Sequence, residues 1–131
     1  MSRLIYLDNA ATTKTAPEVV DAMIPYFTEH YGNPSSVYSF ASGNKEVVSR
    51  QREIIAQALG AQANEIYFTA GGSESDNWAL KATAEAYEKK GKHIITTKIE
   101  HHAILHTCEY LEKQRGFEIT YLDVDLSLIH I

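Results

Sequence analysis

The stretch of this 131-residue chain that is best suited to binding or catalysis is a glycine pair followed by a serine, at residues 71–73. It follows a short apolar run (66–69) and precedes a helical pattern that starts near Glu74. A helix N-terminus presents unpaired N–H groups and the positive end of its dipole, which together attract anions. Glycine tolerates positive φ and lets the backbone approach a ligand, so the pattern is consistent with a phosphate cradle. The spacing of Ser73 and Asp76 also fits a capping box, and the local pattern leaves both interpretations open.

The histidines and the cysteine are further candidates for chemistry. His101 stands where an apolar run gives way to a helical pattern, and by itself it is typical of a helix start. His102 and His106 are spaced to share one helix face, but no cysteine or acidic cluster completes a metal site, so no metal is expected. Cys108 falls on the apolar side of the same helix, which is typical of an unreactive core thiol rather than a nucleophile.

The elements that must position these residues alternate between strand and helix. We expect strands at 66–69, 93–97 and 117–122, separated by helices at about 74–90 and 100–115, each followed by a glycine. This βαβαβ order predicts an α/β fold, in which a parallel sheet is covered by helices. Ligands of such sheets bind at the carboxyl ends of the strands, so residues 71–73 and 97–102 should lie on one rim.

The N-terminal half carries a different pattern. It consists of a β-prone run at 4–7, a polar loop at 8–13, a helix from Pro17 to about 31 and a second helix from about 44 to 59. Pro25 should kink or split the first helix, and Gly60 should close the second in the left-handed conformation.

Composition excludes several classes of protein. The net charge is −5 and the charges are dispersed, which argues against nucleic-acid binding. No apolar run approaches the about 20 residues of a membrane span, and the N-terminus does not resemble a signal peptide. A single cysteine cannot form an internal disulfide, so we expect a cytoplasmic protein.

The C-terminal end suggests a truncated chain. The βαβ pattern stops abruptly, and residues 126–131 match a translated adaptor of the kind used in sequencing libraries. We therefore expect residues 1–125 to be the N-terminal portion of a longer domain, and residues 126–131 to be non-native.

Four motifs now combine into one family pattern. They are residues 7–13 (LDNAATT), 32–36 (GNPSS), 70–77 (AGGSESDN) and 100–103 (EHHA). In this order and spacing the chain resembles the NifS/IscS-like cysteine desulfurases, which are class V, fold type I pyridoxal-phosphate enzymes. The resemblance spans roughly residues 4–125, about the N-terminal third of a full family member. It implies that the fold is part of the large domain of such a transferase.

The resemblance also implies a role for individual residues. Gly72 and Ser73 would bind the phosphate of pyridoxal 5'-phosphate, and His101 would stack on its ring and assist proton transfer. The loop residues Asn9, Ala10, Ala11 and Thr12 would border the substrate pocket.

The resemblance further implies an activity for the parent protein. The parent would convert L-cysteine to L-alanine and hold the sulfur as a persulfide for iron–sulfur cluster or thio-cofactor assembly. It would form a homodimer and deliver sulfur to an acceptor or scaffold protein. The Schiff-base lysine and the nucleophilic cysteine of the family would lie beyond residue 131, so this chain alone should be inactive. Its own Lys14, Lys81, Lys92 and Lys98 are typical of surface or helix-end charges.

Three alternatives to this function stay open. The parent could be another class V enzyme, such as a selenocysteine lyase or an aminotransferase. The chain could instead be a non-catalytic βαβ module that binds phosphate groups, or a degenerate fragment without function.

Overall fold

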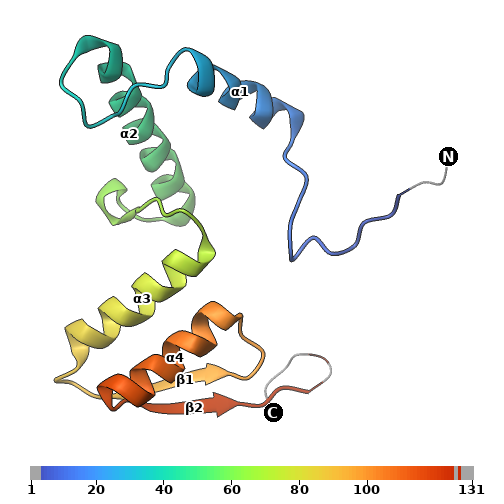
Figure 1. Cartoon of the computed structure of the whole chain (residues 1–131), viewed down its shortest axis with the longest axis vertical. Helices are drawn as coiled ribbons and strands as arrows, with labels where there is room; N and C mark the ends of the chain where they lie inside the picture. The colour runs from blue at the N-terminus through green and yellow to red at the C-terminus, as the bar shows by residue number, and fades with distance from the viewer. Residues whose placement is uncertain (1–3, 126, 128–131) are drawn as a thin grey trace. The chain divides into compact units, whose positions relative to one another are not determined.

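The computed structural model describes residues 4–125 and 127, and the chain divides into two compact units, Met1–Tyr67 and Phe68–Ile131. Figure 1 shows the elements in chain order. They are α1 (Pro17–Thr28), α2 (Ser39–Leu59), a short 3-10 helix η1 (Ala63–Glu65), α3 (Gly72–Tyr87), β1 (His93–Thr97), α4 (His102–Arg115) and β2 (Glu118–Leu122). None of the helices within the described part of the chain is both long and apolar enough to span a membrane.

Helix α1 begins with Pro17 in its first turn, a position where the missing N–H of proline has no partner to lose. Pro25 lies inside the helix but does not split it. The N–H of Glu29 still donates to the Pro25 carbonyl at 2.8 Å, so the chain stays helical past the proline. The helix ends at Thr28, before the predicted residue 31, and none of its residues is buried.

Helix α2 starts at Ser39, earlier than the predicted residue 44, and ends at Leu59 as predicted. Gly60 has φ 68° and closes the helix in the left-handed conformation, which confirms the predicted cap. Buried Asn44 holds the preceding loop onto α2, because its Nδ2 donates to the carbonyls of His30 and Gly32 at 2.7 and 2.6 Å. A Cβ on Gly32 would lie 3.0 Å from the Ala41 Cα, so this close approach requires glycine.

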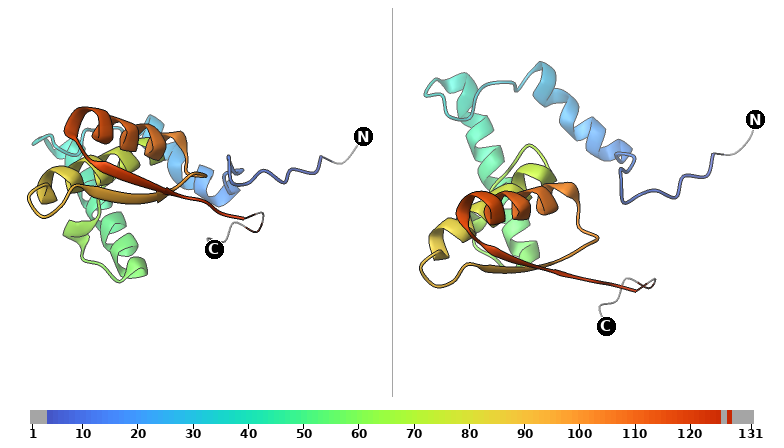
Figure 2. Two further views of the ribbon diagram at one scale, coloured as in Figure 1. Left: turned by 90° about the horizontal axis from the view of Figure 1, so that it is seen from below. Right: turned by 60° about the horizontal axis from the view of Figure 1, so that its bottom comes forward.

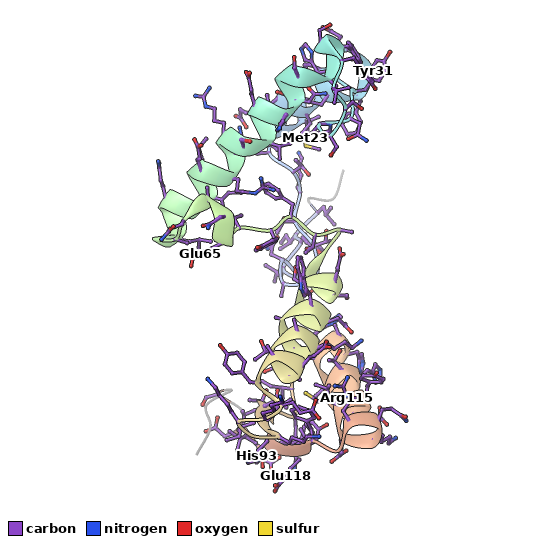
Figure 3. The ribbon with its side chains drawn as sticks, turned by 90° about the vertical axis from the view of Figure 1, so that its left-hand side faces the viewer. Met23, Tyr31, Glu65, His93, Arg115 and Glu118 are labelled. Atoms are coloured by element: carbon purple, nitrogen blue, oxygen red, sulfur yellow. The ribbon has the colours of Figure 1, made fainter. Side chains whose placement is uncertain are left out.

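The second unit is built on a parallel pair of strands. β1 pairs with β2 from His93↔Glu118 to Thr97↔Leu122, and α4 forms the crossover between them. Figure 2 shows the strands side by side with α3 and α4 along one face, and Figure 3 shows paired His93 and Glu118 at the start of the sheet. The core residues under the helices are Ala84, Leu111 and Phe117, with Ile94 and Ile119 packed against them. This arrangement confirms the predicted βαβ unit and its parallel sheet.

The predicted strand at 66–69 is not formed, and the β-prone run at 4–7 forms no strand either. Residues 66–69 and 4–7 have no strand assignment, and within the described residues the sheet contains β1 and β2 alone. The side chains of residues 4–7 are exposed. A β-strand exists only when its N–H and C=O groups pair with a neighbouring strand, and β-prone composition cannot supply that neighbour. The predicted βαβαβ pattern is therefore realised as βαβ, preceded by α3.

The end of α3 also differs from the prediction. The helix ends at Tyr87, so Lys89 and Lys90 lie beyond its last turn. Gly91 is not among the glycines with positive φ, and it does not cap the helix in the left-handed conformation. At the end of α4, Gly116 has φ 68° and its N–H bonds to the Leu111 carbonyl, as the cap prediction requires. Apart from Ser127, the tail predicted to be non-native lies outside the described residues.

Candidate functional site

The N-terminus of α3 forms one side of the candidate site. Gly71 is its N-cap residue in an extended conformation, and Gly72 is the first helical residue, so neither glycine uses positive φ. The predicted capping box is absent, because Ser73 already lies in the first turn. The Glu74 carboxylate accepts the N–H of Ala70, the residue before the N-cap, at 2.6 Å, so it does not cap the first N–H groups of α3 either. Ser73 therefore does not cap its own helix.

Hydrogen-bond donors at this helix end therefore remain available. The first helical N–H bonds come from Glu74 and Ser75, both to the Gly71 carbonyl. Within the described part of the chain, the N–H groups of Gly72 and Ser73 have no backbone acceptor. The Ser73 hydroxyl has no partner among the described residues. A Cβ on Gly71 or Gly72 would meet no atom within 4 Å, so there is room for a ligand in front of the helix.

The N-terminus of α4 forms the other side. His101 is its N-cap residue, and the His101 Nδ1 accepts the Ala103 N–H at 3.1 Å. A neutral imidazole that accepts a hydrogen bond at Nδ1 carries its proton on Nε2. The neighbouring Glu100 uses its carboxylate to accept the Thr97 hydroxyl at 2.9 Å, which closes the turn between β1 and α4 before His101.

The two helix ends open onto one pocket of about 440 Å³. Its walls are formed by Ser73, Asn77, Lys81, His101, His102, Ala103, His106, Thr107 and Tyr110. The structure thus brings Ser73 and His101 together at one pocket, although they belong to different helices. A flat ring and a set of anion-binding donors at one pocket could hold a phosphorylated aromatic ligand. The roles of Gly72, Ser73 and His101 toward such a ligand stay predictions.

The loop predicted to border the substrate pocket lies in the other unit. It forms a turn in which the Ala11 N–H donates to the Asp8 carbonyl at 3.1 Å. The Tyr6 hydroxyl closes this turn by donating to the carbonyls of Asp8 and Thr12 at 2.8 and 3.2 Å. Asn9, Ala10, Ala11 and Thr12 are exposed, and their assignment to a substrate pocket stays a prediction.

Sequence reasoning missed several residues in the pocket wall. Thr107 Oγ1 donates to Asn77 Oδ1 at 2.9 Å, and Asn77 Nδ2 donates to the Ser73 carbonyl at 2.9 Å. Lys81 is exposed, as predicted for a surface charge. Its ammonium lies 5.1 Å from the centre of the Tyr110 ring, and both residues form part of the pocket wall. The helical spacing of Ser73, Asn77 and Lys81 was the available signal, since positions four apart share a helix face.

Cys108 is buried in α4, which confirms its predicted place in the core. Burial raises the pKa of its thiol, and the negative charges of Glu100 and Glu112 act in the same direction. His102 and His106 are exposed, and their rings stack with centroids 5.2 Å apart. The described residues contain no group of three or more His, Cys, Asp or Glu side chains placed to hold a metal ion.

Comparison with known proteins identifies the family. A profile of the family Aminotransferase class-V matches residues 5–128. The chain belongs to the class-V aminotransferase family. Among the curated class-V relatives, "Cysteine desulfurase IscS" of Clostridium botulinum (strain Kyoto / Type A2) is 60% identical over 125 residues, which are 95% of this chain and 31% of the relative. "Cysteine desulfurase IscS" of Methanosarcina thermophila is 58% identical over 124 residues, covering 95% and 30% of the two chains.

Two solved structures share the fold of this chain over about a third of their own length. A "NIFS-LIKE PROTEIN" superposes with a TM-score of 0.82 at 42% identity over 89% of this chain and 32% of its own. "SspA in complex with cysteine" gives a TM-score of 0.80 at 40% identity over 88% and 33%. These neighbours confirm the predicted fold class, that of the NifS-like, fold type I proteins. The chain spans about a third of the length of the curated class-V relatives that it matches.

Proposed function

We propose that this chain forms the part of a pyridoxal-phosphate-dependent cysteine desulfurase that holds the cofactor's phosphate and faces its ring. The observation that carries the proposal is the shared pocket of Ser73 and His101, each at the N-terminal end of a helix. The class-V family membership supports the choice of cofactor, because pyridoxal phosphate is the cofactor implied by that family.

The hydrogen-bond donors at the N-terminus of α3 suit the cofactor's phosphate end. The N–H groups of Gly72 and Ser73 and the Ser73 hydroxyl would donate to the phosphate oxygens, aided by the helix dipole. When bound, pyridoxal phosphate supplies an electron sink for bond cleavage next to an amino group. The imidazole of His101 would lie against the ring, with the proton on Nε2 available for transfer.

For the whole protein we propose the conversion of L-cysteine to L-alanine, with the sulfur retained as a persulfide on an enzyme cysteine. The names of the relatives support this reaction, and one structural neighbour was solved in complex with cysteine. The proposal extends to a homodimer in the cytoplasm that passes sulfur to an acceptor or an iron–sulfur scaffold protein. The 131-residue chain alone should be inactive, because none of its lysines stands in the family's lysine motif.

The first prediction tests the phosphate role. In the full-length protein, Ser73→Ala should weaken the affinity for pyridoxal phosphate roughly tenfold or more, since it removes a hydrogen bond to a charged group. Ser73→Thr retains the hydroxyl and serves as the matched control. Affinity is measured by absorbance titration of the cofactor-free protein. Equal affinities of the wild-type and Ser73→Ala proteins would contradict the assignment.

The reaction itself is tested by supplying the full-length enzyme with L-cysteine or L-selenocysteine and measuring alanine release. A preference for selenocysteine would favour a selenocysteine lyase, and transfer of an amino group without alanine release would favour an aminotransferase. Binding of nucleotides with no affinity for pyridoxal phosphate would favour a non-catalytic phosphate-binding module.

A further inference from the structure

Asn77 joins the two sides of the pocket through both ends of its amide. Its Nδ2 donates to the carbonyl of Ser73, one turn earlier on α3, at 2.9 Å. Its Oδ1 accepts the hydroxyl of Thr107, from α4, at 2.9 Å. Thr107 is only 3% exposed and Asn77 is half-buried, so the bond between the helices is partly shielded from competing water. One side chain therefore links the phosphate-facing residue of α3 to the helix that begins at His101.

The Asn77–Thr107 link lies toward the N-terminal ends of the two helices, close to the pocket. The N-terminal ends of α3 and α4 share the pocket, and Arg115 at the end of α4 bonds to Glu88 at the end of α3 at 3.1 Å. The helices therefore run side by side in the same direction, as Figure 1 also shows. The Arg115–Glu88 pair lies at the opposite end from the pocket, whereas the Asn77–Thr107 bond lies in the pocket wall.

We propose that Asn77, held by Thr107, is a positioning residue that sets the spacing between Ser73 and the ring-facing His101. This inference rests on the proposed function, because the spacing matters only to a ligand that touches both residues. Pyridoxal phosphate is such a ligand, with its phosphate at Ser73 and its ring at His101. Inorganic phosphate would contact the α3 end alone, and it is therefore insensitive to the spacing.

The test compares these two ligands in one set of variants of the full-length, cofactor-free protein. Thr107→Val removes the hydroxyl but keeps the shape of the side chain, and Thr107→Ser keeps the hydroxyl and serves as the matched control. Thr107→Val should lower the affinity for pyridoxal phosphate about tenfold, as expected for loss of one partly shielded hydrogen bond. The affinity for inorganic phosphate should change less than about twofold, and Thr107→Ser should bind both ligands like the wild type.

Two results would overturn the inference. Unchanged cofactor affinity in Thr107→Val would show that the link is dispensable. An equal loss for both ligands would show that the link only supports the α3 end. If the wild-type protein bound no pyridoxal phosphate, the proposed function itself would fail. If Thr107→Val does not fold, Asn77→Ala replaces it, because Asn77 is only half-buried; this variant removes both hydrogen bonds of the link and is compared on the same two ligands, with the same two results overturning the inference.

Discussion

At the scale of single residues, environment decides which reactive groups are available. Ser73 is exposed, and its hydroxyl has no hydrogen-bond partner among the described residues. His101 is exposed too, with a hydrogen bond from the Ala103 N–H to Nδ1. Cys108 has the opposite environment, since it is fully buried in α4. The serine and the histidine can therefore meet a ligand, whereas the cysteine belongs to the core.

The burial of Cys108 predicts low reactivity. Its thiol has a raised pKa, chiefly from desolvation, and the thiolate is the nucleophilic form. At neutral pH, a thiol reagent should label Cys108 in the folded chain at least about ten times more slowly than in the same chain unfolded in urea. The raised pKa also makes stability depend on pH. The neutral thiol contributes fully to the stability of the folded chain at pH values below the ordinary thiol pKa, and this contribution is lost as the pH rises through the raised pKa. Equal labelling rates in the two states would contradict the core assignment.

At the scale of elements, α3 and α4 are held together at three levels. The Asn77–Thr107 bond lies at the pocket end, Ala84 and Leu111 lie in the shared core, and the Glu88–Arg115 pair lies at the far end. The apolar contacts supply most of the stability, because exposed ion pairs contribute little. The polar contacts instead fix how the two helices are aligned along their length.

The far end offers a test by pH. Hydrogen bonds from Lys92 and then from Arg115 lower the pKa of Glu88, so its ionised form is favoured in the folded chain. Such a group stabilises the folded chain at pH values above the ordinary pKa of glutamate, and this contribution is lost as the pH falls through the lowered pKa. Glu88→Gln should therefore lower the thermal midpoint slightly near neutral pH, and by less as the pH becomes acidic or the salt concentration rises.

The matched control is Glu85→Gln, which changes an exposed glutamate on the same helix that has no ion pair among the described residues. Its thermal midpoint should follow that of the wild type at every pH. A difference between Glu88→Gln and wild type that persists unchanged into acid would rule out the ion pairs as its cause.

At the scale of the whole molecule, the two units differ in what they bury. The second unit has a core under α3 and α4, whereas α1 in the first unit has no buried residue. Several large apolar side chains of the first unit are exposed, including Phe27 at 72% and Leu59 at 70%. A 12-residue helix that buries none of its residues gains little stability from tertiary packing, and a helix of that length is marginally stable in water by itself.

This difference predicts the pattern of hydrogen exchange in the 131-residue chain. Amides of β1, α4 and β2 should be protected, and those of α1 should exchange much faster, because local opening of α1 exposes no fully buried residue. Mass spectrometry of peptides from each element would measure both. Comparable protection of α1 and α4 would contradict the prediction.

Much of the second unit was predictable because its signals are local. The run of β-branched residues at His93–Thr97 became β1, the helix after it ended at Gly116, and Cys108 fell on the buried side of α4. Helical periodicity and the left-handed conformation of glycine depend on a residue and its near neighbours. The sequence could therefore also reveal the four family motifs before any contact was known.

Contacts between distant residues were decided only by the tertiary structure. Residues 66–69 have the composition of a strand but no strand to pair with in the described chain. The Thr107–Asn77 bond joins residues 30 positions apart, and neither residue shows this in its local pattern. Sequence alone determined the family and the elements that carry Ser73 and His101. Only the folded chain could bring the two into one pocket, since strand pairing and helix–helix hydrogen bonds require a partner from elsewhere in the molecule.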